Sequence, residues 1–170
     1  ALAIFEKEYK YFNKELAEID VSILYNLYNT NGFHFAEIYF EFTADTIKHI
    51  NSLNFYITEN EQYKISSIQY KGLEDLPPDD KERVNQRSNL LPGDYFNEYQ
   101  IETEMQAINL SLLNRGYMFS KWSYPNVIMD TTNCTDSIVG YFDTGKKIRF
   151  GDIIFADSTN NQKNVANSTK

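Results

Sequence analysis

The chain has 170 residues, which is enough for one ordinary domain or two small ones. Its 24 acidic and 16 basic side chains give a net charge of −8, which argues against a nucleic acid as the main partner because clustered cations bind phosphate backbones. The single cysteine, Cys134, excludes an internal disulfide, and no apolar run reaches the ~18 residues of a membrane span.

A helix is the first predicted element and begins after Tyr11–Asn13. Its buried stripe follows the spacing i, i+4, i+7, i+11 and consists of Ala17, Val21, Leu24 and Tyr28. Asn13 stands where an N-cap is preferred, and Gly32 stands where a left-handed cap needs a residue without Cβ. We therefore expect the helix to end just before Gly32.

Strands follow this glycine. The alternating apolar positions of the first strand, which predict one buried face, are Ala36, Ile38, Phe40 and Phe42. A second strand is expected over Ile50–Ile57, after a turn at Asp45–Lys48. The polar turn Thr58–Glu61, in which Asn60 tolerates a positive φ, leads to a third strand over Lys64–Tyr70.

Two more helices are predicted beyond Gly72. Pro77-Pro78 can start a helix but cannot lie inside one, so we expect a short helix around Asp79–Arg87. A longer helix follows Asn97, its N-cap, and ends before Gly116. Its buried stripe is Ile101, Met105, Ile108 and Leu112.

The last third of the chain is predicted to hold further strands. We expect a strand over Phe119–Tyr124 that Pro125 stops, and another over Ser137–Phe142. A polar turn, Asp143–Lys146, precedes a strand over Arg149–Phe155. The tail Ser158–Lys170 is rich in Asn, Ser and Thr, and is predicted to be disordered.

The chain repeats itself. Tyr11–Lys14 recurs as Tyr95–Glu98, and Asn31–Glu37 recurs as Arg115–Lys121, both at an offset of 84. The strand Tyr63–Tyr70 recurs at an offset of 85, as residues 148–155. One repeat is therefore strand–helix–helix–strand–strand, an α+β layer of two helices on a three-stranded mixed sheet.

The order and spacing of these motifs resemble tandem POTRA (polypeptide-transport-associated) domains. Asn54–Gly72 is similar to the junction between successive POTRA domains, and Leu91–Asn97 is similar to the start of their second helix. Leu113–Tyr117 resembles the Gly-Tyr exit from that helix, and Gly145–Ile153 resembles the next junction. The resemblance covers Tyr11 to Phe155 and is strongest to the central domains of BamA-type proteins, with a TamA-like relative as the other subfamily.

The resemblance implies three segments and a location. Residues 1–60 would be a partial unit with its second helix and last two strands, 61–145 a complete unit, and 146–170 the first strand of a following unit plus the tail. The chain would lie on the periplasmic side of the bacterial outer membrane and precede a membrane barrel of the same protein. Its implied partners are unfolded outer-membrane proteins and accessory assembly lipoproteins, and no cofactor or metal is implied.

The resemblance also indicates a binding mechanism. In this family the strand after Gly-Tyr lies at a sheet edge, where unpaired backbone groups can accept an added strand. The corresponding edges here are Phe35–Phe42 and Phe119–Tyr124. The expected polypeptide-binding residues are Phe35, Glu37, Tyr39, Glu41, Phe119, Lys121, Ser123 and Tyr124. The alternative is that these edges are covered or are blunted by Lys121 and Pro125.

Catalysis and metal binding find little support in the sequence. His34, His49 and Cys134 are the usual nucleophile or base types present, and each is interpreted as a surface residue. The carboxylates Asp79-Asp80 and Glu74-Asp75 lack the spacing of a calcium loop and are interpreted as solvated charge before a helix. We therefore predict no catalytic, cofactor or metal site.

A structural spacer or docking platform without client contact is the other functional hypothesis, in a TamA-like or two-partner-secretion transporter. Its surface would be formed by aromatic residues that lie off the helical stripes. These are Tyr9, Tyr11, Tyr25 and Tyr99.

Overall fold

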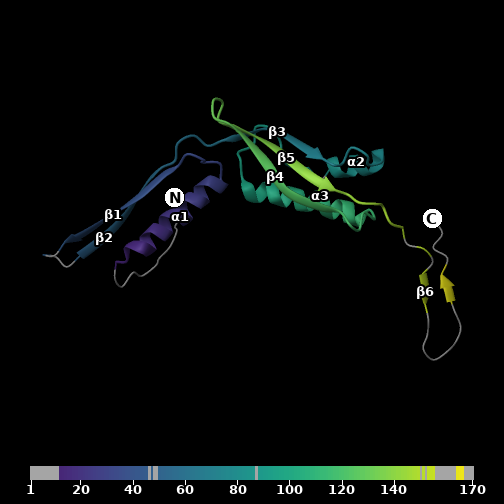
Figure 1. Ribbon diagram of the computed structural model, residues 1–170, viewed down its shortest axis with the longest axis horizontal. Helices are drawn as coiled ribbons and strands as arrows, with labels where there is room; N and C mark the ends of the chain where they lie inside the picture. Colours follow the sequence, from purple (N-terminus) through teal and green to yellow (C-terminus); the bar gives the residue numbers. More distant parts are fainter. Residues whose placement is uncertain are drawn as a thin grey trace. The chain divides into compact units, whose positions relative to one another are not determined.

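The computed structural model describes residues 12–45, 47, 50–86, 88–149 and 151, and the backbone of 153–155 and 164–166. The elements in chain order are α1 (Lys14–Thr30), β1 (Glu37–Asp45), β2 (Ile50–Thr58), β3 (Lys64–Lys71), α2 (Pro78–Asn85), α3 (Glu98–Asn114), β4 (Lys121–Asp130), β5 (Thr135–Asp143), β6 (Ile153–Phe155) and β7 (Asn164–Ala166) (Figure 1). Tyr9, Tyr11, His49 and the expected tail, apart from β7, lie outside the described residues.

The fold is α+β, as the sequence predicts. β1 and β2 form an antiparallel pair, in which Tyr39 lies opposite Tyr56. A three-stranded sheet has the order β3-β5-β4, so β4 lies at one edge. The amide of Lys64, at the start of β3, donates to the carbonyl of Cys134, just before the start of β5. The two strands therefore begin side by side and run parallel, so the sheet is mixed. A short antiparallel pair joins β6 to β7.

The chain divides into two compact units. The first contains the residues up to Ile68 together with 90–101 and 127–138. The second contains 69–89, 102–126 and the residues from Val139 onward. β3, α3, β4 and β5 each contribute residues to both units. The segments 1–60, 61–145 and 146–170, expected from the repeat, remain a proposal.

The two long helices begin with the same cap. The side-chain oxygen of Asn13 accepts a hydrogen bond from the amide of Leu16, at 3.2 Å. The side chain of Asn97, 84 residues later, accepts from the amide of Gln100 at 2.9 Å. Each cap satisfies an amide that the first helical turn leaves unpaired, so the predicted helix starts are confirmed.

The helices also end alike. Gly32 and Gly116 have φ values of +87° and +95°, which a residue with a Cβ rarely adopts. The carbonyl of Gly32 accepts from the amide of Tyr63 at 2.9 Å, and the carbonyl of Gly116 accepts from the amide of Ile148 at 2.8 Å. The repeat seen in the sequence is therefore a repeat of backbone hydrogen bonds.

The core of each unit includes residues from α3. In the first unit Ile101 packs with Ile65 and Ile138, and in the second Met105, Ile108 and Leu112 pack with residues such as Phe142. The predicted stripe of α3 is fully confirmed, because its four residues are at most 2% exposed. The stripe of α1 is confirmed only in part, because Ala17 is buried whereas its other members are half-buried.

The prediction that Pro125 stops a strand is wrong. β4 runs from Lys121 to Asp130 and includes Pro125, which is buried. Because β4 lies at the edge of its sheet, the amide hydrogen that proline lacks is not needed for pairing. β4 has 10 residues where β1 has 9, so the change of the repeat offset from 84 to 85 falls within β4.

Candidate functional site

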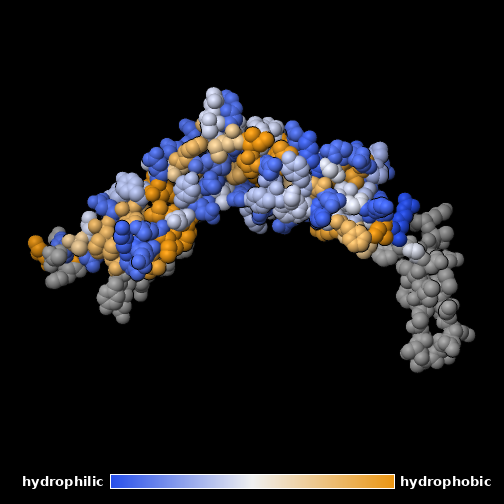
Figure 2. Space-filling view, viewed as in Figure 1, coloured by the Kyte–Doolittle hydropathy of each residue, from blue (hydrophilic) through white to orange (hydrophobic). Residues whose placement is uncertain are grey.

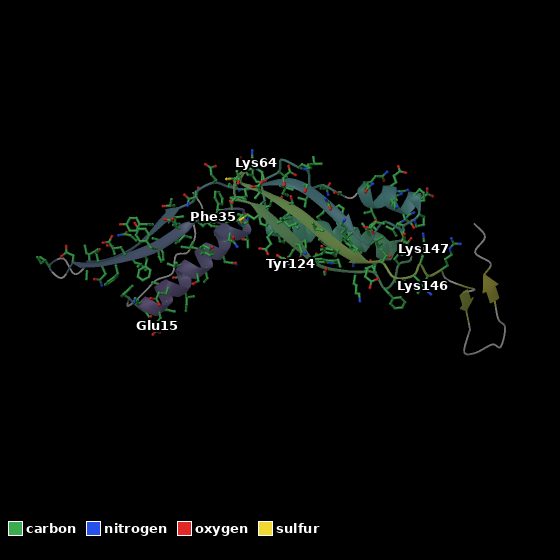
Figure 3. All side chains as sticks on the ribbon, turned by 45° about the horizontal axis from the view of Figure 1, so that its top comes forward. Glu15, Phe35, Lys64, Tyr124, Lys146 and Lys147 are labelled. Atoms are coloured by element: carbon green, nitrogen blue, oxygen red, sulfur yellow. The ribbon has the colours of Figure 1, made fainter. Side chains whose placement is uncertain are left out.

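The expected binding residues lie at or next to the two edge strands. Glu37, Tyr39 and Glu41 lie in β1, whereas Lys121, Ser123 and Tyr124 lie in β4. Phe35 and Phe119 precede these strands (Figure 3, which labels Phe35 and Tyr124). The carbonyl of Phe35 already accepts a hydrogen bond from the side-chain amide of Asn60, at 2.7 Å. The edge with regular strand backbone therefore begins at Glu37 rather than at Phe35.

The β1–β2 pair has one packed face and one open face. On the packed face the ring of Phe12, just before α1, stacks on Phe42 with centroids 3.9 Å apart and lies 6.3 Å from Phe40. Phe40 lies 6.2 Å from Phe55 on β2. The alternate residues of both strands are exposed. Some apolar side chains also reach the surface over α1 and this hairpin, as Figure 2 shows.

Tyrosines occupy the centre of the open face. The rings of Tyr39 and Tyr56 stack with centroids 5.0 Å apart. The hydroxyl of Tyr56 donates to the carboxylate of Glu41 at 3.1 Å. This hydrogen bond and the negative charge of Glu41 raise the pKa of Tyr56.

The edge of β4 differs from that of β1. The ammonium of Lys121 lies 3.6 Å from the carboxylate of Asp143, on the neighbouring strand β5, and both side chains are exposed. Pro125 removes one backbone donor from the strand. β1 contains no proline, so it offers the less interrupted edge for pairing.

The interpretation of His34 as a surface residue is wrong. Its side chain is 7% exposed, and Nε2 lies 2.8 Å from Oδ2 of Asp136, which is fully buried. Nδ1 lies 2.9 Å from Oδ1 of Asn29. The rings of Tyr63 and Phe96 each form a T-shaped contact with the imidazole, with centroid distances of 4.9 Å. The His34–Asp136 pair connects the loop after α1 to the start of β5.

The interpretation of Asp80 as solvated charge is wrong as well. This residue is 1% exposed and accepts hydrogen bonds from three side chains, Arg115, Tyr117 and Lys147, the last two at 2.8 Å. Burial alone would raise the pKa of Asp80, but the hydrogen bonds from Lys147, Tyr117 and Arg115 outweigh it and lower the pKa to about 2. Burial, followed by Asp80 itself, raises the pKa of Tyr117 to about 12.

The charge of Asp80 is therefore balanced by the side chains of Arg115 and Lys147. Among the residues that the structure describes, no group of three or more His, Cys, Asp or Glu side chains could hold a metal ion. Cys134 is partly exposed in the turn before β5, with a φ of +51°. In the same described part of the chain, no helix combines the length and apolarity required to cross a membrane.

Sequence alone did not find the His34 and Asp80 clusters because their members are far apart in the chain. Asp136 lies 102 residues from His34, and Lys147 lies 67 residues from Asp80. The available signal was weak. Arg115 and Lys147 directly precede Gly116 and Ile148, the two residues joined by the repeated backbone hydrogen bond. The preceding copy has Asn31 and Gln62 at these positions.

Comparisons with known proteins identify the central segment. The model of the POTRA family, described as the surface antigen variable number repeat, matches residues 63–138. This segment is therefore similar to POTRA domains. The match starts at the beginning of β3 and extends into β5, so it includes both helices of the predicted complete unit. None of the curated proteins compared with the chain matches it significantly.

Solved structures of BamA POTRA domains and of an Omp85 N-terminal domain are among those that match the chain. The POTRA3–5 structure of Haemophilus influenzae BamA is 22% identical over 76% of this chain and 50% of that one, with a TM-score of 0.49. The POTRA4 structure of the same protein is 22% identical over 52% and 98%, with a TM-score of 0.42. The N-terminal domain of Omp85 from Thermosynechococcus elongatus is 13% identical over 76% and 49%, with a TM-score of 0.44. The chain thus spans half of the first of these structures.

Proposed function

We propose that the chain is a periplasmic part of an outer-membrane protein assembly factor of the BamA type. In this role it binds unfolded outer-membrane polypeptides by strand addition and contacts accessory lipoproteins, and a membrane barrel of the same protein follows it. The POTRA family match supports the class of protein. The observation that carries the binding mechanism is the position of β1 and β4 at sheet edges.

Strand addition fits a receptor with many clients, because backbone hydrogen bonds do not depend on the identity of the side chain. β1 is the stronger site of the two, since β4 contains Pro125 and carries the Lys121–Asp143 ion pair beside its edge. The edge residues proposed to contact the client are Glu37, Tyr39, Glu41, Lys121, Ser123 and Tyr124, with Phe35 and Phe119 at the approach to each strand.

Nuclear magnetic resonance of the full chain tests this mechanism. Synthetic peptides that correspond to single strands of outer-membrane barrels are titrated against the labelled protein, with scrambled peptides as one control. A second control carries N-methyl groups on alternate peptide nitrogens, which removes the donors of one peptide edge without changing its side chains. We expect weak binding that shifts the amides of Glu37–Asp45 more than those of Lys121–Asp130, and that N-methylation abolishes.

The alternative is a spacer or docking platform in a TamA-like or two-partner-secretion transporter. The exposed rings of Tyr25 and Tyr99, at 45% and 77%, favour a surface for folded partners. Shifts that are equal for native and N-methylated peptides, or no shift at millimolar peptide, would reject strand addition and favour this alternative.

A further inference from the structure

The open face of β1–β2 has a chemistry of its own, apart from the backbone edge. We call it the acidic tyrosine face. Its members alternate with the packed residues along both strands, and each is exposed. They are Glu37, Tyr39, Glu41, Thr43, Ser52, Asn54, Tyr56 and Thr58. The set contains carboxylates and aromatic rings but no Lys or Arg, so its charge is uniformly negative.

The centre of this face is ordered before any partner binds. Tyr39 is 60% exposed and stacks on Tyr56, whose hydroxyl is held by Glu41. Glu37 lies two residues from Tyr39 on the same face, and no described residue forms a hydrogen bond or ion pair with its carboxylate. A stacked pair of rings with a carboxylate on either side is therefore presented to solvent, and no cation among the described residues pairs with these carboxylates.

The corresponding face of the second copy does not share this chemistry. At the repeat offset Glu37 and Tyr39 correspond to Lys121 and Ser123. Thr58 corresponds to Asp143, which pairs with Lys121 across the strands at 3.6 Å. The second face thus pairs a carboxylate with a cation, whereas no described cation pairs with the carboxylates of the first. The difference identifies the acidic tyrosine face as a feature of one repeat rather than of the fold.

We propose that the acidic tyrosine face binds an arginine-bearing segment of a partner protein. A guanidinium group is planar, so it can stack on the ring of Tyr39 while its N–H groups bond the carboxylate of Glu37. An ammonium group stacks less well and is more strongly hydrated, so lysine is the weaker ligand. The partner binds through side chains perpendicular to the sheet, so this proposal does not depend on strand addition at the edge.

The test uses the full chain and a short peptide of alternating arginine and threonine, acetylated and amidated at its ends. Matched peptides replace arginine by lysine or by citrulline, which has nearly the same shape but no charge. We expect resonance shifts at Glu37–Glu41 and Tyr56 with the arginine peptide. The affinity should be at least about fivefold weaker with citrulline, since each cation–π contact or exposed ion pair contributes about 1 kcal/mol. Salt should weaken the binding as well.

Variants locate the site. Glu37→Gln combined with Glu41→Gln should reduce the affinity by at least about fivefold, and Tyr39→Ser, which introduces the residue of the second copy, should do the same. Tyr141→Ser changes the exposed tyrosine of β5 that corresponds to Tyr56, and it should leave the affinity unchanged. Equal affinity for citrulline, equal affinity for lysine, or an unchanged affinity in the double glutamine variant would overturn the proposal.

A transfer experiment covers the case in which a β1 variant fails to fold. Lys121→Glu combined with Ser123→Tyr places a carboxylate and a ring on β4 beside Tyr141. We expect this variant to gain arginine-dependent shifts over β4 and β5 that the natural chain lacks. If the variant has the same unfolding temperature as the natural chain and still shows no gain, the result would count against the proposed chemistry.

Discussion

Gly72 and Gly93 both have a positive φ, +83° and +99°, but their surroundings differ. A Cβ at Gly72 would overlap the carbonyl oxygen of Phe142 in β5, whereas a Cβ at Gly93 would meet nothing within 4 Å. Gly72 therefore serves both its own backbone conformation and the close approach of β5, and Gly93 serves the conformation alone.

We expect Gly72→Ala to destabilise the protein far more than Gly93→Ala. The second change costs about 1–2 kcal/mol, the strain of a left-handed residue with a Cβ. The first adds a clash with backbone that cannot rotate away, so a loss above about 3 kcal/mol is expected. Urea unfolding of both variants measures the difference. Similar losses would show that β5 can move away from Gly72.

Asp80 is the second residue whose replacement gives a sharp result. Asp80→Asn leaves Arg115 and Lys147 without their anion in a partly buried site, so we expect a loss of about 2–3 kcal/mol at neutral pH. Asp79→Asn, at an exposed neighbour, is the matched control and should change the stability little.

The lowered pKa of Asp80 in the natural chain predicts how its stability relative to the Asp80→Asn variant depends on pH. The carboxyl group titrates at about 2 in the folded protein and at 3.8 when unperturbed, so its stabilisation is complete above the unfolded value. It is lost as the pH falls through the folded value. The stability gap between the natural chain and Asp80→Asn should therefore close as the pH falls from 5 toward 2. A gap that persists at the acid end would contradict the ion-pair assignment.

At the scale of elements, helices were predicted best, because their signals are local. The cap at Asn13, the stripe of α3 and the glycine at the end of each helix are read within a few residues of one another. The end of β4 was missed because Pro125 was treated as the end of the strand, although the strand was expected at a sheet edge and edge strands tolerate proline.

Equivalent positions of the two repeated helices differ in burial, so we expect them to differ in their contribution to stability. Ile108 in α3 is fully buried, whereas Leu24, its counterpart in α1, is only half-buried. We expect Ile108→Ala to cost about 3–4 kcal/mol and Leu24→Ala about 1 kcal/mol, because the cavity term applies only where the surroundings are packed. Chemical denaturation curves compare the two. Equal costs would mean that α1 is packed as tightly as α3.

At the scale of the whole molecule, the features that could not be predicted from the sequence are contacts between residues far apart in the chain. The fold class and the repeat follow from periodicity, since each copy reproduces the same local rules. The His34–Asp136 pair has no local signature, because its partners lie 102 residues apart and the second copy has Met118 where the first has His34. The starts of the candidate edge strands were located to within two residues, but their accessibility depended on Asn60, Asp143 and the course of β4.

This long-range pair should be energetically coupled. We expect a double-mutant cycle of His34→Ala and Asp136→Asn to give a coupling of about 1–2 kcal/mol, since each change alone leaves a buried polar group unpaired. A cycle of Lys14→Ala and Glu18→Ala, an exposed i, i+4 pair, should give less than about 0.5 kcal/mol. A coupling near zero for the buried pair would mean that each side chain acts independently.

The backbone hydrogen bond that closes both junctions, from Tyr63 to Gly32 and from Ile148 to Gly116, has a consequence for how such chains diversify. A hydrogen bond between main-chain atoms does not depend on side-chain identity, so any repeat that keeps the glycine and the spacing can form it with the repeat that follows. The side chains around it are then free to vary, as amides beside Gly32 and charges beside Gly116 have done. A repeat can thus be duplicated or exchanged first and change its side chains afterwards, because the backbone hydrogen bond at the junction stays the same.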